Sequence, residues 1–165
     1  MASHEFFREI EHREVPWGDR TIHVPVFYRD AETITAVFTA SLEAVLKLLP
    51  SSRIRPIRVS PRRCLLGVTG HEFRDSDAGA YNEVGIGIPF TLDVQTPILA
   101  TLRGQSQGEP KTYIHQLPVT TEIARDLGVE FAGYPKFVAQ IEYEEDASWR
   151  TCHREQLGSG LALQH

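Results

Sequence analysis

The strongest constraint on the fold is a series of short segments that the sequence predicts to be extended. They cover residues 55–59, 63–70, 81–92, 96–103 and 111–119, and clusters of Gly, Pro, Asp and Ser separate them. Short segments bounded by such clusters are typical of β-strands, and residues 20–29 also alternate, with Ile22, Val24 and Val26 on one side. Further strands are expected over residues 20–29, 136–144, 148–154 and 160–164. This pattern predicts a curled, largely antiparallel sheet.

Two segments have helical spacing instead. Apolar residues recur every three or four positions over residues 31–49, which follow Asp30 as the expected N-cap and precede Pro50. A second helix is expected over residues 120–129, capped by Thr120 or Thr121 and ending near Gly128. Many strands and only two helices favour the α+β class, with helices at one side of the sheet, over alternating βαβ units.

The length and charge of the chain limit its organisation and its partners. A chain of 165 residues suits one domain, so a single domain over residues 1–165 is expected, with the polar residues 1–19 as a loosely held arm. No apolar run approaches the ~18 residues of a membrane span, and we expect no membrane contact. The net charge is -5 and no basic stripe is present, so no nucleic-acid partner is expected.

The cysteines and histidines indicate no metal site and no cofactor. Cys64 and Cys152 fit no metal-ligand spacing and are interpreted as reduced thiols of a cytoplasmic protein, with a single disulfide as the alternative. The seven histidines are scattered, and neither H-x-H nor H-E-x-x-H occurs. Structural or surface positions are the expected roles of these histidines.

One candidate site segment is A-Y-N-E-V-G-I-G-I-P-F, at residues 80–90. On a strand, the side chain of Glu83 shares a face with Tyr81 and with two glycines, Gly85 and Gly87. Glycine inside a strand often marks a place where a ligand or another backbone comes close. Glu83 is therefore a candidate to face an open space. The more ordinary alternative is a solvent-facing glutamate on a bulged strand.

The other candidate segment is L-P-V-T-T-E-I-A-R-D-L-G-V-E-F-A-G-Y-P-K-F-V-A-Q, at residues 117–140, in which a helix leads into G-Y-P-K. Pro135 keeps Tyr134 away from helical angles, and Gly133 allows a sharp turn. Lys136 then begins an apolar strand, which suits a fixed and desolvated amine. The alternative is a lysine whose apolar stem is buried while its head reaches water.

Together these segments resemble the acetoacetate decarboxylase family. The resemblance rests on the order Y-N-E-x-G-x-G-I-P-F, L-P-V-T-T-E-x-A-R-x-L-G-x-E and G-Y-P-K, and it runs from about Arg20 to the C-terminus. It implies a cone- or barrel-like sheet with few helices and a homo-oligomer. It also implies that Lys136 forms a Schiff base with a keto substrate, that Glu83 is the glutamate of the active site, and that Arg20 helps to hold the substrate carboxylate. The expected substrate-binding residues are then Arg20, Tyr81, Gly85, Gly87 and Tyr134.

The function implied is that of a carbon–carbon lyase which decarboxylates a small β-keto acid without a cofactor. A neutral lysine amine condenses with a ketone to a protonated imine, and this cation accepts the electrons left when carbon dioxide departs. A lysine with the ordinary pKa of ~10.4 is almost wholly protonated at pH 7, so burial or a neighbouring cation has to favour the neutral form.

Three departures from the family pattern keep other functions open. Phe137 stands where the decarboxylase has a second lysine, residues 65–70 lack an expected acid, and the chain is shorter than a typical decarboxylase. One alternative is aldolase- or dehydratase-type Schiff-base chemistry on an α-keto acid. Another is a non-catalytic small-molecule-binding domain that kept the fold. Open sheet edges of a short chain could be covered by another subunit.

Overall fold

The computed structural model describes residues 7–104, 106, 108–145 and 150–155. The chain forms two compact units. The first contains the described residues of 1–34, 70–84 and 118–165, and the second contains those of 35–69 and 85–117. Several long strands have one part in each unit. The single domain expected over residues 1–165 stays a prediction.

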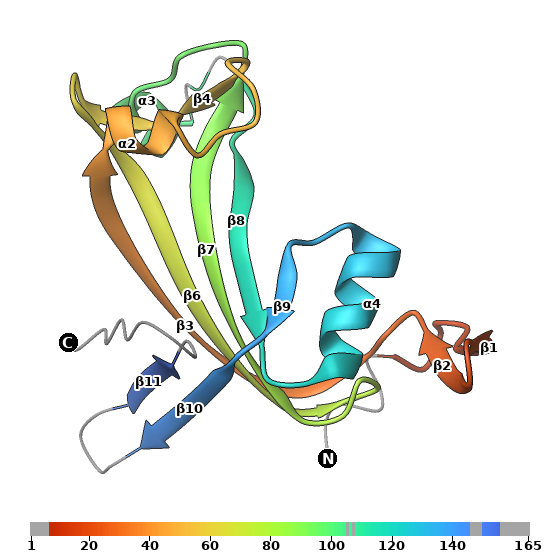
Figure 1. The fold of residues 1–165 in the computed structure, drawn as a ribbon. Coiled ribbons are helices and arrows are strands. Elements are labelled where there is room, and N and C mark those ends of the chain that lie inside the picture. The colour runs from red at the N-terminus through yellow and green to blue at the C-terminus, as the bar shows by residue number, and fades with distance from the viewer. Residues whose placement is uncertain (1–6, 105, 107, 146–149, 156–165) are drawn as a thin grey trace. The chain divides into compact units, whose positions relative to one another are not determined.

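The α+β class expected from the sequence is confirmed, because antiparallel strands dominate and helices are few. The main sheet has the order β3-β6-β7-β8-β9, with β4 beside β7 and β5 beside β6. Figure 1 shows the β7 and β8 arrows running in opposite directions. This order has two end strands, so the sheet is open and not closed into a barrel. The elements are β1 (Arg13–Trp17), β2 (Arg20–Val24), β3 (Tyr28–Ser41), α2 (Leu42–Leu46), β4 (Ile54–Pro56), β5 (Arg58–Ser60), β6 (Arg63–Ser76), β7 (Tyr81–Leu92), α3 (Ile98–Leu102), β8 (Lys111–Val119), α4 (Glu122–Ala132), β9 (Lys136–Val138), β10 (Gln140–Glu145) and β11 (Arg150–Glu155).

The first unit begins with a hairpin where the sequence predicted a loose arm over residues 1–19. Strand β1 pairs antiparallel with β2, from Arg13 opposite Val24 to Trp17 opposite Arg20. Gly18 occupies the turn with a φ of 62°, a left-handed conformation that glycine adopts without strain. The hairpin places Trp17 and Arg20 side by side at its tip.

Helix α4 follows β8 in the first unit and leads to the lysine strand (Figure 1). Thr121 is its N-cap, and the Thr121 hydroxyl accepts a hydrogen bond from the amide of Ala124 at 3.4 Å. This start confirms one of the two caps expected from the sequence. The end expected near Gly128 is wrong, because the helix continues to Ala132 and stops at Gly133, which has a φ of 64°.

A buried cluster supports α4 within the first unit. Tyr81, Val119 and Ala124 form it with Ala78, and their exposed fractions are all 4% or less. Partly buried apolar residues pack against this cluster, namely Val26, Phe73 and Leu127. The start of β7, the end of β8 and the first turns of α4 therefore share one apolar core.

The helix expected over residues 31–49 is wrong. Strand β3 continues to Ser41, and exposed and half-buried residues alternate along it, as they do in a strand beside β6. The helix α2 covers only Leu42–Leu46, and the hydroxyl of Ser41, not the side chain of Asp30, caps it. Apolar residues at even positions such as Ile34 and Phe38 fit a helical and a strand period equally well, and pairing with β6 decided between them.

The second unit has its own buried cluster of Leu42, Val45, Cys64 and Ile88. Cys64 is a free thiol with an exposed fraction of 0%, and burial raises its pKa. The strand expected over residues 96–103 is wrong, because Pro97 precedes a short helix, α3. Strands expected over residues 81–92 and 111–119 are confirmed as β7 and β8.

The C-terminal expectations have mixed outcomes. The strand predicted over residues 136–144 is present as two strands, β9 and β10. Strand β11 occupies most of the segment expected over residues 148–154. The strand predicted over residues 160–164 lies outside the described residues. Among the residues that the structure describes, no helix is long and apolar enough to cross a membrane.

Candidate active site

Lys136 and Glu83 form a buried ion pair in the first unit. Lys136 Nζ lies 2.7 Å from Glu83 Oε2, and the exposed fractions of the two side chains are 7% and 11%. Apart from Lys136, no described residue donates to Oε2. Strand β8 lies between β7 and β9. Neighbouring strands are about 4.8 Å apart, so the two long side chains meet across one intervening strand.

Helix α4 covers the stem of Lys136 at a glycine. A Cβ atom on Gly128 would lie 2.6 Å from Cε of Lys136 and closer still to Cδ. The amides of Gly133 and Tyr134 donate to the carbonyls of Val129 and Gly128 at 3.1 and 3.0 Å, and these bonds end the helix. Gly128 therefore makes room for the lysine, a role that the sequence did not reveal.

Tyr81 forms an apolar wall beside the amine. Lys136 Nζ lies 5.6 Å from the centroid of the Tyr81 ring, within the range of a cation–π contact. The Tyr81 hydroxyl lies 3.2 Å from that of Tyr28. Burial, followed by the neighbouring Tyr28 and Glu83, raises the pKa of Tyr81 above its ordinary value of 10.0. The phenol therefore stays neutral at neutral pH.

Asn82 ties the glutamate strand to the chain on both sides of α4. Its amide donates to the hydroxyl of Thr120 at 2.9 Å, and the amide of Thr120 donates back to the Asn82 carbonyl at 3.0 Å. The side chain of Asn82 donates to the carbonyl of Ile141 at 3.0 Å. The residue between Tyr81 and Glu83 thus fixes β7 against β8 and β10.

His71 is a member of this site that the sequence analysis had assigned a structural or surface role. It lies on β6, next to β7, and its Nδ1 is 2.9 Å from the hydroxyl of Thr33. Burial lowers the pKa of His71, the charge of Glu83 raises it and the charge of Lys136 lowers it. All three titratable groups are thus within electrostatic reach of one another. No H-x-H or similar spacing signals this, because the cluster arises from three strands.

The two glycines of β7 lie in the second unit, and side chains fill the space beside them. A Cβ atom would lie 3.3 Å from Leu117 Cδ1 at Gly85 and 2.6 Å from Thr112 Cγ2 at Gly87. The open space expected at these glycines is thus occupied by side chains of β8. Tyr134, another expected substrate contact, adjoins Lys136 in sequence and is 47% exposed.

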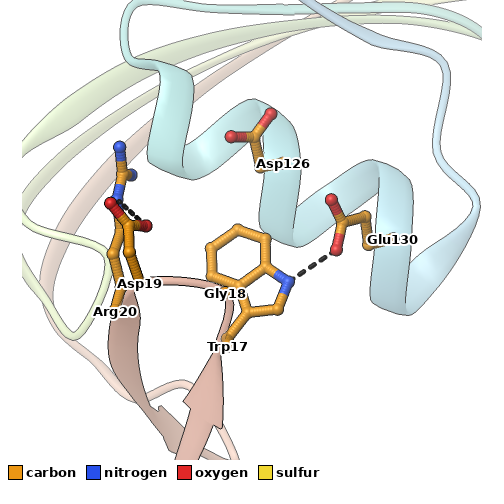
Figure 2. Close-up of a pocket in the computed structure, with 6 residues that line it drawn as sticks. All are labelled: Trp17, Gly18, Asp19, Arg20, Asp126 and Glu130. Atoms are coloured by element: carbon orange, nitrogen blue, oxygen red, sulfur yellow. Dashed lines mark hydrogen bonds and ion pairs between the residues drawn. The ribbon is translucent and has the colours of Figure 1, made fainter.

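Arg20 lies in a different pocket, at the tip of the N-terminal hairpin (Figure 2). The pocket measures about 330 Å³ and is lined by Trp17, Gly18, Asp19, Arg20, Asp126 and Glu130. Trp17 Nε1 donates to Glu130 Oε2 at 2.5 Å, and Arg20 Nε is 3.9 Å from Asp19 Oδ1. Lys136 and Glu83 are not among its lining residues.

Helix α4 separates the Arg20 pocket from the lysine stem. Asp126 and Glu130 are four residues apart, so they share one side of α4; both line this pocket, and Figure 2 shows Glu130 joined to Trp17. Gly128 lies two residues from each, about 160° around a helix of 3.6 residues per turn. The structure therefore brings Lys136, Glu83 and Tyr81 together, but it places Arg20 against the opposite face of α4.

The fold and the buried pair define an α+β protein whose candidate site is built around a lysine and a glutamate. The sequence model of the family described as acetoacetate decarboxylase matches residues 13–162. The chain therefore belongs to the acetoacetate decarboxylase family, as its motifs indicated. No curated protein matches the chain.

Solved structures share this fold at low sequence identity. A structure titled as structural studies of acetoacetate decarboxylase has a TM-score of 0.64 and 18% identity, over 81% of this chain and 47% of that chain. Acetoacetate decarboxylase from Legionella pneumophila has a TM-score of 0.61 and 14% identity, over 79% and 45%. The enduracididine biosynthesis enzyme MppR complexed with pyruvate has a TM-score of 0.54 and 12% identity, over 79% and 52%. The chain thus spans about half the length of these proteins.

Proposed function

We propose that Lys136 forms a Schiff base with a small keto acid and that the protein is a carbon–carbon lyase, most simply a decarboxylase of a β-keto acid. The observation that carries this proposal is the ion pair of Lys136 Nζ and Glu83 Oε2, 2.7 Å apart and almost fully buried. Burying two charges away from water costs free energy unless the charges pair with each other. Membership of the family supports the same chemistry.

Glu83 is the base that frees the amine. The proton of the Lys136 ammonium passes to Glu83 Oε2, the nearest carboxylate oxygen. The neutral amine then attacks the ketone carbon, and Glu83 returns the proton to the hydroxyl of the addition product. That hydroxyl leaves as water, and a protonated imine on Lys136 remains. Proton transfer within the pair needs no third group, because Nζ and Oε2 are only 2.7 Å apart.

The protonated imine then drives the loss of carbon dioxide. The bond between the carboxylate and the adjacent carbon breaks, and its electron pair moves into the imine to give an enamine. A proton from water adds to that carbon, and the hydroxide left behind adds to the imine carbon, which releases the ketone and the free amine. The ring of Tyr81, 5.6 Å from Nζ, stabilises the cation.

The same imine serves other keto acids, so the alternatives from the sequence remain part of the proposal. Aldolase- or dehydratase-type chemistry on an α-keto acid uses the same first step, and the structure of MppR complexed with pyruvate belongs to a protein of similar fold. A domain that binds a small molecule without catalysis is the second candidate, since Phe137 replaces the second lysine of the family pattern. Homo-oligomeric assembly and a cytoplasmic location are proposed with it.

Borohydride trapping tests the proposal. The protein is mixed with acetoacetate or pyruvate and reduced, and the adduct is located by peptide mass spectrometry while carbon dioxide release is measured. We expect an adduct on Lys136, with release of carbon dioxide from acetoacetate. Lys136→Arg should abolish the adduct, whereas Lys47→Arg and Lys111→Arg should not, and these are the other two lysines of the chain.

The outcomes separate the candidate functions. An adduct on Lys136 without carbon dioxide release favours aldol or dehydration chemistry. No adduct on Lys136 with either keto acid contradicts the Schiff-base proposal and leaves the binding domain.

A further inference from the structure

A keto acid at Lys136 needs a group that holds its carboxylate, and Arg20 lies against the opposite face of α4. We propose that His71 donates a hydrogen bond to the substrate carboxylate beside Lys136 and Glu83. This inference rests on the proposed Schiff-base function and names the residue that selects an acid over a simple ketone. Within the described part of the site, His71 is a hydrogen-bond donor within electrostatic reach of both members of the ion pair.

The orientation of the His71 ring follows from the strand order. Thr33 lies on β3 and Glu83 on β7, and β6 with His71 runs between these two strands. Nδ1 is 2.9 Å from the Thr33 hydroxyl, so the opposite edge of the ring, with Nε2, is turned toward β7. The ring also stacks on Phe73, with centroids 5.4 Å apart and an interplanar angle of 15°. The imidazole is therefore held from one edge and one face.

The charge state of His71 suits a neutral donor. Burial lowers the pKa of His71. The charge of Glu83 raises this pKa, and the charge of Lys136 lowers it. At neutral pH the ring is uncharged and carries one proton. When the Thr33 hydroxyl donates to Nδ1, this proton sits on Nε2, the edge that faces the substrate. This tautomer is assigned from the hydrogen bond to Thr33.

A neutral donor fits the reaction better than a guanidinium would. The negative charge leaves the carboxylate as carbon dioxide forms, so a strong cation at the carboxylate would stabilise the ground state more than the transition state. A hydrogen bond from an uncharged imidazole orients the carboxylate with a smaller penalty of this kind. His71 would thus bind the acid and still allow its charge to move into the imine.

The test compares a keto acid with the ketone that remains when its carboxylate is removed. Borohydride trapping on Lys136 is measured over a range of acetoacetate and acetone concentrations. His71→Phe removes the donor and keeps a ring on Phe73. We expect about tenfold weaker half-saturation with acetoacetate, the loss of one charge-assisted hydrogen bond, and a change below about twofold with acetone.

Two further variants separate binding from structure. His71→Gln keeps a donor near the Nε2 position and should restore most of the trapping with acetoacetate. His115→Phe makes the same replacement on β8, in the second unit, and should leave trapping with acetoacetate and with acetone unchanged. Equal weakening with both ketones in His71→Phe would show a merely structural role and overturn the inference.

Arg20 is the alternative residue for binding the substrate carboxylate, and its variant is measured in the same way. If Arg20→Gln weakens trapping with acetoacetate but not with acetone, and His71→Phe does not, then Arg20 holds the carboxylate and the inference about His71 is wrong. A wild-type protein that traps neither ketone overturns the Schiff-base function itself, and the role of His71 with it. If the wild type forms the adduct but no variant weakens trapping with acetoacetate more than trapping with acetone, only the role of His71 is wrong.

Discussion

Lys136 crosses helix α4 at Gly128, a buried helical position where a Cβ atom would come within 2.6 Å of the lysine Cε. Glycine in a helix interior usually costs about 1 kcal/mol relative to alanine. In this chain the missing side chain of Gly128 leaves room for the stem of Lys136 against α4. The position of Nζ beside Glu83 therefore depends on a residue that has no functional group.

Gly128→Ala should displace the amine without unfolding the protein. The atoms that the new methyl group meets belong to a flexible lysine side chain, which moves more easily than the helix. A misplacement of about 1 Å can reduce catalysis on the order of 100-fold, so we expect at least a tenfold loss of trapped adduct. Thermal unfolding should change by only a few degrees. Val129→Ala, at a 45% exposed position of the same helix, is the control and should keep the adduct.

The ion pair should show strong coupling in a double-mutant cycle. Glu83→Gln leaves the Lys136 ammonium buried without its counter-charge and should lower the free energy of unfolding by about 3 kcal/mol. Lys136→Met should have a similar effect on Glu83. The double variant Lys136→Met with Glu83→Gln should recover most of the loss, because no buried charge remains. Urea denaturation measures the four proteins, and additive losses would contradict a coupled pair.

Asp77 should make the protein sensitive to acid. Its side chain is 7% exposed, accepts a hydrogen bond from the Phe27 amide at 2.7 Å and pairs with Arg29 and His12. Burial alone would raise the pKa of Asp77, but the Phe27 amide and the Arg29 guanidinium hold it below its ordinary value of 3.8. A lowered pKa means that the stabilisation is present above the ordinary value and is lost as the pH falls through the folded pKa.

Asp77→Asn therefore tests this carboxylate. At pH 7 we expect a loss of about 2 kcal/mol in the free energy of unfolding, since charge-assisted hydrogen bonds are lost. The difference from wild type should shrink as the pH falls below 3.8, because the wild-type carboxyl is then protonated too. Asp75→Asn is the matched control. Asp75 is 57% exposed and pairs with the same Arg29 at 3.3 Å, so its loss should be small at every pH.

Tyr81 should act through its ring more than through its hydroxyl. Tyr81→Leu removes the cation–π contact of 5.6 Å with Lys136 and should reduce trapped adduct several-fold, the effect of about 1 kcal/mol. Tyr81→Phe keeps the ring and loses only the contact with the Tyr28 hydroxyl at 3.2 Å. Its adduct should stay within about twofold of wild type. Equal losses in both variants would instead assign the role to the hydroxyl.

Local patterns were sufficient for the elements whose neighbours agree with them. Extended segments between turn residues predicted β7 and β8. The start of α4 was expected at Thr120 or Thr121, and Thr121 is the cap, since a capping hydroxyl acts within one turn of its own helix. Local patterns failed for residues 31–49, where β-sheet pairing with β6 outweighed a helical spacing of apolar residues.

The site divides in the same way. The motifs around Glu83 and around Lys136 are each a short continuous stretch, so the sequence alone offered both residues as candidates and indicated the family to which the protein belongs. The tertiary structure decided that His71 joins them, that Gly128 admits the lysine and that Arg20 lies across α4. These three placements depend on which strands are neighbours and on which face of α4 is covered. Contacts between residues far apart in the chain are set by packing, and no short stretch of sequence encodes them.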